Sequence, residues 1–442
     1  MKNVLTSLLI LGFILIAISG FSQRAGELFT SANLKLDQLD FRGAIKDYTK
    51  ALITDPSNAD IYFNRAYCKS RINDHLGAVQ DYNKAIAIYP DMPNAYYNRA
   101  IAKEHLKDYK GAIQDHTIAL SQDPNNANIY FSRGINKSLI KDHLGAIQDF
   151  NKTISLNPLT VNIYFNRGIE KGYLQDYSGA IQDYNKAISV DSSNADIYAN
   201  RAFVYNSLKN FSAAVQDFSK AISLAPNRSD LYFARAVTRG YVNLSALAIE
   251  DYTKAIEINP STNNVFFNRG IEKSHLGNYK SALLDFNKAI ELNPNNADIY
   301  FNRGILKAGM GDYAASLKDY NRAIELNPSI INSYFNRGIA KAHLNDRAGA
   351  INDFNQALFQ NPDNSDIYFN RGLEKVHLRD HAGALVDFNK GVALSPPNAD
   401  LYYNRGLVKM SLKDTTGGCA DFMLAKNLGS GLAIAQLSKN CK

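Results

Sequence analysis

The sequence has no tryptophan, only three cysteines, and no apolar run after residue 22 that is long enough to cross a bilayer. No Ser/His/Asp set, glycine-rich phosphate loop or paired-carboxylate motif rises above chance, which leaves a catalytic function without residues to perform it. The formal charge of +7 is small for 442 residues, and charge alone does not indicate nucleic-acid binding. We therefore expect a protein that is not an enzyme and that holds no cofactor or metal.

Residues 1–22 have the composition of a secretory signal peptide. Lys2 supplies a positive start, Val4–Ile18 is a largely apolar run, and small residues follow it. Such a run is short for a membrane span. We expect cleavage between Ser22 and Gln23 and an exported bacterial-type protein, periplasmic or secreted, with no integral membrane span in the mature chain. An uncleaved N-terminal anchor is the alternative.

An arginine recurs at a constant spacing, eleven times without interruption, at Arg65, Arg99, Arg133, Arg167, Arg201, Arg235, Arg269, Arg303, Arg337, Arg371 and Arg405. A fixed period of this length indicates a stacked-repeat protein. Counting 34-residue blocks from Ala25 predicts twelve repeats, numbered here 1 to 12: 25–58, 59–92, 93–126, 127–160, 161–194, 195–228, 229–262, 263–296, 297–330, 331–364, 365–398 and 399–432. The remaining tail, 433–442, is expected to form a C-terminal capping helix.

Repeat 9, residues 297–330, illustrates the pattern within one block. Its apolar spacing predicts a first helix (helix A) over 299–310 and a second helix (helix B) that ends near Leu326. The carboxylate of Asp312 is placed to cap helix B, because it can accept from the free backbone N–H groups at a helix start. Pro328 then prevents helix B from continuing into the next repeat. Residues are numbered below by their position, 1 to 34, within each repeat.

The aromatic, small and proline positions of this block resemble those of the tetratricopeptide repeat (TPR) family. Tyr300, Gly304, Ala323 and Pro328 stand at that family's first aromatic, close-contact, late alanine and proline positions. The resemblance covers nearly the whole mature chain and implies an all-α fold, a right-handed α-solenoid of helix–turn–helix repeats around a concave groove. Two features depart from the family: arginine and lysine at positions 7 and 11, and aspartate at position 23 of all twelve repeats.

The arginine series has two interpretations, a phosphate-binding stripe or an internal ladder of ion pairs with the aspartates. We favour the ladder, since a buried arginine needs a partner. Repeat 1 has Ser31 at position 7, so pairing within a repeat would leave its aspartate without an arginine. The sequence therefore predicts that each aspartate binds the cation of the next repeat: Asp47–Arg65, Asp81–Arg99, Asp285–Arg303, Asp387–Arg405 and, at the end, Asp421–Lys439. The position-11 lysines have no role in this scheme.

Helix A carries the residues predicted to bind a partner. Position 5 is aromatic almost throughout, position 6 is mostly asparagine, position 9 is apolar, and position 2 is aspartate or asparagine from repeat 2 onward. The predicted groove residues are Phe63, Asn64, Tyr97, Asn98, Phe131, Phe165, Asn166, Phe267, Asn268, Phe301, Asn302, Phe335, Asn336, Phe369 and Asn370. The asparagine row resembles that of the superhelical domain in the O-GlcNAc transferase family, whose catalytic part is absent here. Two alternatives stay open: the aromatics pack on neighbouring helices, and the asparagines bond to the adjacent repeat.

The cysteines predict one disulfide. Cys419 and Cys441 lie symmetrically about a Gly-Ser-Gly break, so antiparallel flanking helices would bring their thiols together, and export would let the bond persist. Cys68 would remain as a small buried residue.

These patterns favour a protein-interaction scaffold that binds an extended polypeptide segment in a concave groove. An adaptor that uses its convex face or its ends in an envelope complex is the first alternative, and single-stranded nucleic-acid binding the second. The sequence does not indicate an oligomeric state.

Overall fold

The structure is a computed structural model that describes residues 24–158, 161–261, 263–395 and 397–441, and every regular element in these ranges is a helix. The predicted signal peptide lies outside them. The chain divides into two compact units, 1–225 and 226–442, called here the N-terminal and C-terminal halves. Among the described residues, no helix is long and apolar enough to cross a membrane.

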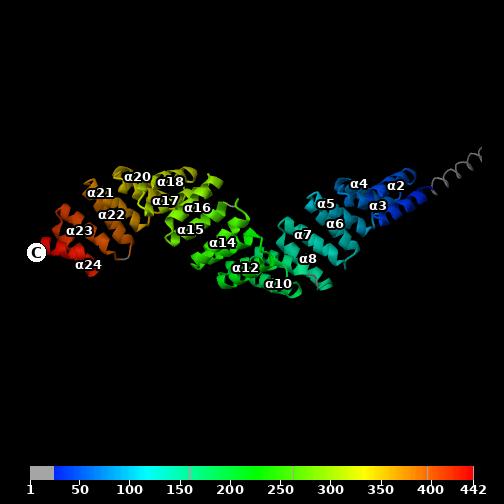
Figure 1. Cartoon of the computed structure of the whole chain (residues 1–442), viewed down its shortest axis with the longest axis horizontal. Helices are drawn as coiled ribbons and strands as arrows, with labels where there is room; N and C mark the ends of the chain where they lie inside the picture. The colour runs from blue at the N-terminus through cyan, green and yellow to red at the C-terminus, as the bar shows by residue number, and fades with distance from the viewer. Residues whose placement is uncertain (1–23, 159–160, 262, 396, 442) are drawn as a thin grey trace, which may run out of the picture. The chain divides into compact units, whose positions relative to one another are not determined.

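The N-terminal half consists of helix pairs that follow the 34-residue period (Figure 1). Its first helix occupies the described residues 24–37. The others are α2 (Phe41–Thr54), α3 (Ala59–Arg71), α4 (His75–Ile88), α5 (Pro93–His105), α6 (Tyr109–Gln122), α7 (Ala127–Leu139), α8 (His143–Leu156), α9 (Val161–Tyr173), α10 (Tyr177–Val190), α11 (Ala195–Ser207) and α12 (Phe211–Leu224).

The C-terminal half continues the same alternation of helix A and helix B and ends on a single helix. Its helices are α13 (Ser229–Tyr241), α14 (Ser245–Ile258), α15 (Asn263–His275), α16 (Tyr279–Leu292), α17 (Ala297–Gly309), α18 (Tyr313–Leu326), α19 (Ser333–His343), α20 (Arg347–Gln360), α21 (Ser365–His377), α22 (His381–Leu394), α23 (Ala399–Ser411), α24 (Thr415–Asn427) and α25 (Gly431–Asn440). Within each half, every helix A packs on the helix B that follows it, and that helix B packs on the next helix A. Each half is thus an α-solenoid of helix–turn–helix repeats.

The turn between helix A and helix B is built in the same way in repeat after repeat. In repeat 9, Gly311 has a φ of +82°, and the next backbone N–H, of Asp312, donates to the carbonyl of Lys307 at 2.9 Å. This left-handed residue with its six-residue hydrogen bond is the Schellman ending of a helix. The Asp312 carboxylate then accepts from the N–H of Ala315 at 3.0 Å, which confirms the predicted cap of helix B.

The core of each repeat is a ring from helix B set against small residues. Position 24 holds a tyrosine or phenylalanine that is almost fully buried in eleven of the twelve repeats, and position 20 is mostly a buried alanine. Position 8 of helix A is glycine or alanine: at Gly304 an added Cβ would lie 2.7 Å from the Tyr320 ring. The small residue therefore sets how closely helix A approaches helix B.

Candidate functional site

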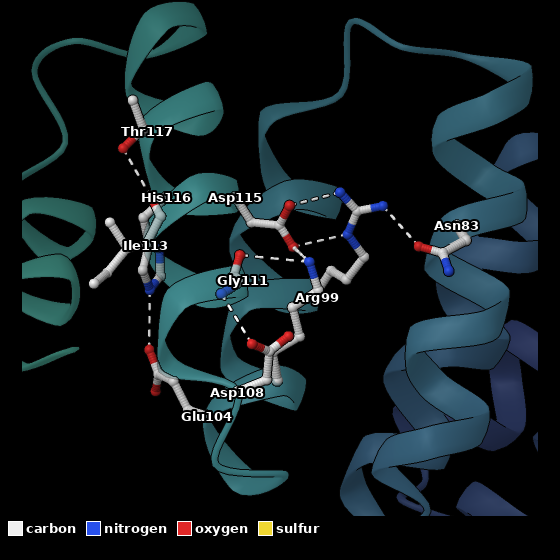
Figure 2. Close-up of polar contacts among 10 residues, drawn as sticks. Asn83, Arg99, Glu104, Asp108, Gly111, Ile113, Asp115, His116 and Thr117 are labelled. Atoms are coloured by element: carbon white, nitrogen blue, oxygen red, sulfur yellow. Dashed lines mark hydrogen bonds and ion pairs between the residues drawn. The ribbon is translucent and has the colours of Figure 1, made fainter. Parts of the chain in front are cut away.

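Each arginine of the periodic series binds the aspartate of its own repeat, on the helix B that follows it. In repeat 3, Arg99 donates through Nε and Nη2 to the two carboxylate oxygens of Asp115, at 2.8 and 2.6 Å (Figure 2). The same two-pronged bond recurs in all eleven repeats that carry the arginine, with distances of 2.5–3.0 Å. The predicted pairing with the next repeat, Asp47–Arg65 and its equivalents, is wrong.

The lysine at position 11 is a second donor to the same carboxylate. In repeat 9, Lys307 Nζ lies 2.7 Å from Asp319, beside Arg303. Because residues 7 and 11 of helix A are one turn apart, both cations reach one aspartate of helix B. At the C-terminal end, Asp421 is held by Arg405 and Lys409 rather than by the predicted Lys439.

In repeat 1, which lacks the arginine, other side chains of the same repeat bind the aspartate. Asp47 is bound by Lys35 Nζ at 2.5 Å and by the Ser31 hydroxyl at 2.9 Å. The lysine bond, aided by the hydroxyl, holds the pKa of Asp47 below 3.8 despite the opposing effect of burial. The position-11 lysine therefore explains how the first repeat keeps its buried carboxylate ionised.

The arginine still fastens neighbouring repeats, but through a different atom and partner. Nη1 of Arg99 donates at 2.7 Å to the side-chain oxygen of Asn83, at position 25 of the preceding repeat (Figure 2). Nine further arginines make this bond to an asparagine or threonine at the same position, at 2.5–3.1 Å. A first repeat has no predecessor, which is why serine suffices there.

The guanidinium groups use their hydrogen-bond donors in these internal contacts. Their side chains are only 13–18% exposed, and each guanidinium carbon also lies 5.3–5.9 Å from the ring of the position-4 aromatic on its own helix. A phosphate would have to displace both the carboxylate and the neighbouring repeat. The arginine series is therefore a structural element and not an exposed anion-binding stripe.

The aromatic row at position 5 packs on the core of its own repeat. Phe301, for example, has its ring centroid 6.1 Å from that of Tyr320 on α18. The rows of predicted groove aromatics repeat this pairing at 5.7–6.2 Å, and all of them are half-buried. Repeat 6 has Ala199 at position 5, and there Phe203 at position 9 packs on Phe218 instead, at 5.1 Å. These aromatics support the helix pair, and only their outer edges are open to a partner.

The asparagine row at position 6 bonds to its own helix. The amide N–H of Asn302 donates to the carbonyl of Asp298, one turn earlier, at 2.8 Å. The same bond is made by Asn98, Asn166, Asn200, Asn268, Asn370 and Asn404, at 2.7–2.9 Å. Only one of the two amide N–H groups is used in this way. Asn64 differs, because it donates to Asn33 of the preceding repeat at 3.3 Å.

A cleft lies between the helices A of two consecutive repeats in each half. The N-terminal cleft lies between repeats 5 and 6, has a volume of about 260 Å³, and is lined by Ile169, Gly172, Tyr173, Tyr177, Tyr184, Asn200, Phe203, Val204 and Ser207. The C-terminal cleft lies between repeats 10 and 11, has a volume of about 380 Å³, and is lined by Ile339, Ala342, His343, Asn345, Arg347, Asn370, Leu373, Glu374 and His377.

The two clefts use equivalent positions of the repeat. The first repeat of each pair contributes its positions 9, 12, 13 and 17, and the second contributes its positions 6, 9, 10 and 13. Positions 2, 6, 9 and 13 form one stripe along helix A, called here the groove face. The sequence predicts positions 2, 5, 9, 12 and 13 on the concave side and position 6 among the groove residues. It therefore includes this stripe, but it also places position 5 in the groove and leaves out position 10.

The groove face carries negative charge although the whole chain is basic. The position-2 aspartates are exposed; they are Asp60, Asp196, Asp230, Asp298, Asp366 and Asp400. The cations of positions 7 and 11 on the same helices are already bound to the position-23 aspartates. Among the described residues, no group of three or more His, Cys, Asp or Glu side chains could hold a metal ion.

The cysteines have two fates in the structure. Cys419 on α24 and Cys441 at the end of α25 form a disulfide, with their Cα atoms 5.7 Å apart. Ser430 caps α25 after the turn at Gly429, so the two helices flank the break as the sequence predicts. Cys68 is fully buried, and this burial raises the pKa of its thiol to about 11.

Family models for tetratricopeptide repeats match the chain over more than half of its length. A model described as TPR repeat matches residues 173–209 and 275–311, and two models described as tetratricopeptide repeat match 195–228 with 297–330 and 29–93 with 335–399. The chain belongs to the tetratricopeptide repeat family. The matching models describe repeats and not catalytic domains, and this fold is that of a protein–protein interaction scaffold.

No curated protein matches the chain. Among solved structures, it is similar to YrrB, described as a TPR protein with an unusual peptide-binding site, at 24% identity over 42% of this chain and 95% of that one, with a TM-score of 0.38. The APC/C hetero-tetramer Cut9–Hcn1 matches at 14% identity over 97% and 99%, with a TM-score of 0.44. Yeast Tom70 matches at 16% identity over 94% and 99%, with a TM-score of 0.38.

Proposed function

We propose that the chain binds extended polypeptide segments along the groove face of its helices A. The observation that carries this proposal is that a cleft in each half is lined by the same repeat positions. An apolar residue at position 9 and an amide at position 6 give each cleft an apolar wall beside hydrogen-bonding groups. That combination suits a peptide chain, which has side chains to bury and backbone groups to satisfy.

The groove face is better placed for binding than the predicted aromatic row. The position-5 rings are needed in the core, whereas Leu373 and Asn370 line the C-terminal cleft directly. The arginines that would contact phosphate in the nucleic-acid alternative are bound to carboxylates, which supports a protein partner instead.

A selection from a displayed library of random 12-residue peptides tests this function. The full mature chain is immobilised, and the best peptide recovered is titrated by fluorescence anisotropy. Replacing Leu373 with serine removes apolar surface inside the C-terminal cleft. The expected loss of affinity is about tenfold, because burying such a side chain contributes roughly 1.5–3 kcal/mol.

Phe359→Ser is the matched control for this titration. Phe359 lies on helix B of repeat 10 and is 88% exposed, so its replacement removes apolar surface outside the cleft. Unchanged affinity in Phe359→Ser with loss in Leu373→Ser supports groove binding. The reverse pattern would favour an adaptor that uses the helix B face, and recovery of no peptide at all would contradict the proposal.

We also propose that the chain is exported and loses residues 1–22. The disulfide between Cys419 and Cys441 supports export, since such bonds persist in oxidising compartments. Expression of the full-length chain in a bacterial host, followed by intact-mass measurement of the periplasmic fraction, should give a chain that starts at Gln23. A cytoplasmic full-length product would refute export, and a membrane-bound full-length product would favour an uncleaved anchor.

A further inference from the structure

Three buried glutamates occupy position 10 in every third repeat. They are Glu170 in repeat 5, Glu272 in repeat 8 and Glu374 in repeat 11, and they are 2%, 9% and 7% exposed. Position 10 lines both clefts on the groove face, and Glu374 itself is part of the C-terminal one. These carboxylates are not members of the arginine ladder, so their burial needs a separate explanation.

Two of the three glutamates have partners from the preceding repeat. Glu170 accepts from the Ser138 hydroxyl at 2.6 Å and lies 2.6 Å from Nδ1 of His143. Glu374 accepts from Nη1 of Arg347 at 2.7 Å. The partners stand at positions 12 and 17 of the preceding repeat. In both repeats, side chains of this chain form the hydrogen bonds of the buried carboxylate.

Glu272 has the same position but neither partner. The equivalent residues of repeat 7 are Gly240 and Ser245, and neither has a charged side chain. The Oε2 atom of Glu272 is buried and has no hydrogen-bond partner. Nδ1 of the His275 ring lies 3.8 Å from Oε2, beyond hydrogen-bond range.

The small residues of repeat 7 let this carboxylate lie close against their backbone. A Cβ on Gly240 would lie 2.7 Å from Oε1 of Glu272, so the carboxylate rests against bare backbone. The Glu272 side chain keeps 11% of its surface exposed. It therefore lies just beneath the groove face, where a side chain arriving from outside can reach it.

We propose that Glu272 receives an arginine side chain of the extended segment bound on the groove face of the C-terminal half. A buried carboxylate without a partner is costly, and a guanidinium would satisfy both of its oxygens. Arg347 shows within this chain that a guanidinium fits beside the equivalent carboxylate of Glu374. The exposed aspartates at position 2, such as Asp298 in the next repeat, favour a basic segment in the same groove.

This inference rests on the proposed groove binding but makes a separate prediction about the free chain. If Glu272 has no partner there, Glu272→Gln should leave the melting temperature unchanged or raise it. Glu374→Gln should lower the melting temperature, because it removes the partner of a half-buried arginine. An equal loss in the two variants would show that Glu272 is already satisfied, and would overturn the proposal.

The binding test compares an arginine with its uncharged analogue citrulline. The probe is the best arginine-containing 12-residue peptide from the library selection, and the arginine is replaced in a second synthesis. We expect citrulline to weaken binding to the wild-type chain by about tenfold or more, since a charge-assisted hydrogen-bonded pair is lost. Glu272→Gln should remove this preference, whereas Glu291→Gln, an exposed residue on helix B, should keep it.

Ser245→Arg supplies the decisive variant. It places an arginine at position 17, as Arg347 does in repeat 10, and should occupy the Glu272 carboxylate from within. We expect this variant to keep its fold and to lose the preference for arginine over citrulline while Glu272 is still present. A preference that survives in Ser245→Arg, or recovered peptides without arginine, would overturn the inference but not groove binding. Failure to recover any peptide would instead contradict the proposed function.

Discussion

The Asp319 carboxylate binds two cations of repeat 9 through three of their nitrogen atoms. Removing this carboxylate is predicted to destabilise the repeat severely. Its side chain is 5% exposed and binds Arg303 through two oxygens and Lys307 through one. Asp319→Ala would leave both cations, themselves only 17% and 19% exposed, without their partner. Breaking a buried pair in this way costs roughly 3–5 kcal/mol. We take about 3 kcal/mol, because the cations keep some contact with water.

The loss can be measured by native-state hydrogen exchange of the amides in α17 and α18. In a repeat protein each repeat contacts mainly its neighbours, so the effect should concentrate on repeat 9 and the repeats beside it. A loss of about 3 kcal/mol corresponds to an exchange rate raised roughly 100-fold. Asp319→Asn should show most of the same loss, since it removes the charge and leaves no cavity.

Asp298→Ala is the control for this prediction. Asp298 is an exposed carboxylate in the first turn of α17, and its removal should cost less than about 1 kcal/mol of helix-dipole interaction. If Asp319→Ala raises exchange no more than Asp298→Ala does, the ladder contributes no more than a surface charge, and the reasoning about the buried carboxylates is refuted.

Further predictions concern single contacts elsewhere. Tyr82→Phe should raise stability by about 1 kcal/mol and Tyr48→Phe should lower it by a similar amount, because only the first hydroxyl is buried without a partner; paired thermal melts would show it. Asn287→Ala should lower the free energy of unfolding by about 1 kcal/mol, since it removes the acceptor of Arg303 Nη1 across a repeat boundary; a double-mutant cycle with Arg303 would isolate this bond. Cys419→Ser should cost about 3 kcal/mol, seen as lost exchange protection in α25 alone. Asp47 should contribute stability at neutral pH that Asp47→Asn lacks. Its loss should begin as the pH falls toward the unfolded pKa and be complete only below the lowered folded-state pKa, where the carboxyl is protonated in both states; melts of both chains over a pH series would show it.

The ion-pair ladder shows how far the sequence reaches. Periodic arginine and aspartate are enough to predict internal pairing, because a charge buried at every repeat must have a partner at the same period. They do not decide which repeat supplies it, since Asp285 and Asp319 lie on the two helices B that flank the helix A of Arg303. The ends of the array predicted that each arginine binds the aspartate of the preceding repeat, because repeat 1 lacks the arginine. Lys35 and Ser31 instead bind Asp47 within repeat 1.

The groove face was predicted only in part for a similar reason. At about 100° per residue, position 6 lies opposite position 8, whereas position 5 lies only about 60° from it. A row of aromatics also has the same period whether it faces a partner or the next helix. The Phe301 ring turns to Tyr320 of its own repeat, and Asn302 bonds to its own helix. The sequence does show glutamate at position 10 of repeats 5, 8 and 11. It does not show which of these carboxylates lacks a partner, because that depends on the side chains at positions 12 and 17 of the preceding repeat.

The sequence by itself determined the alternation of two helices per repeat, the aspartate caps of helix B and the disulfide, because these follow from local propensity and from spacing along one chain. The tertiary structure decided the partner of each arginine, the inward packing of the aromatics and the lone carboxylate of Glu272. Those outcomes depend on which of several equally spaced groups comes within about 3 Å, and a period is the same for all of them.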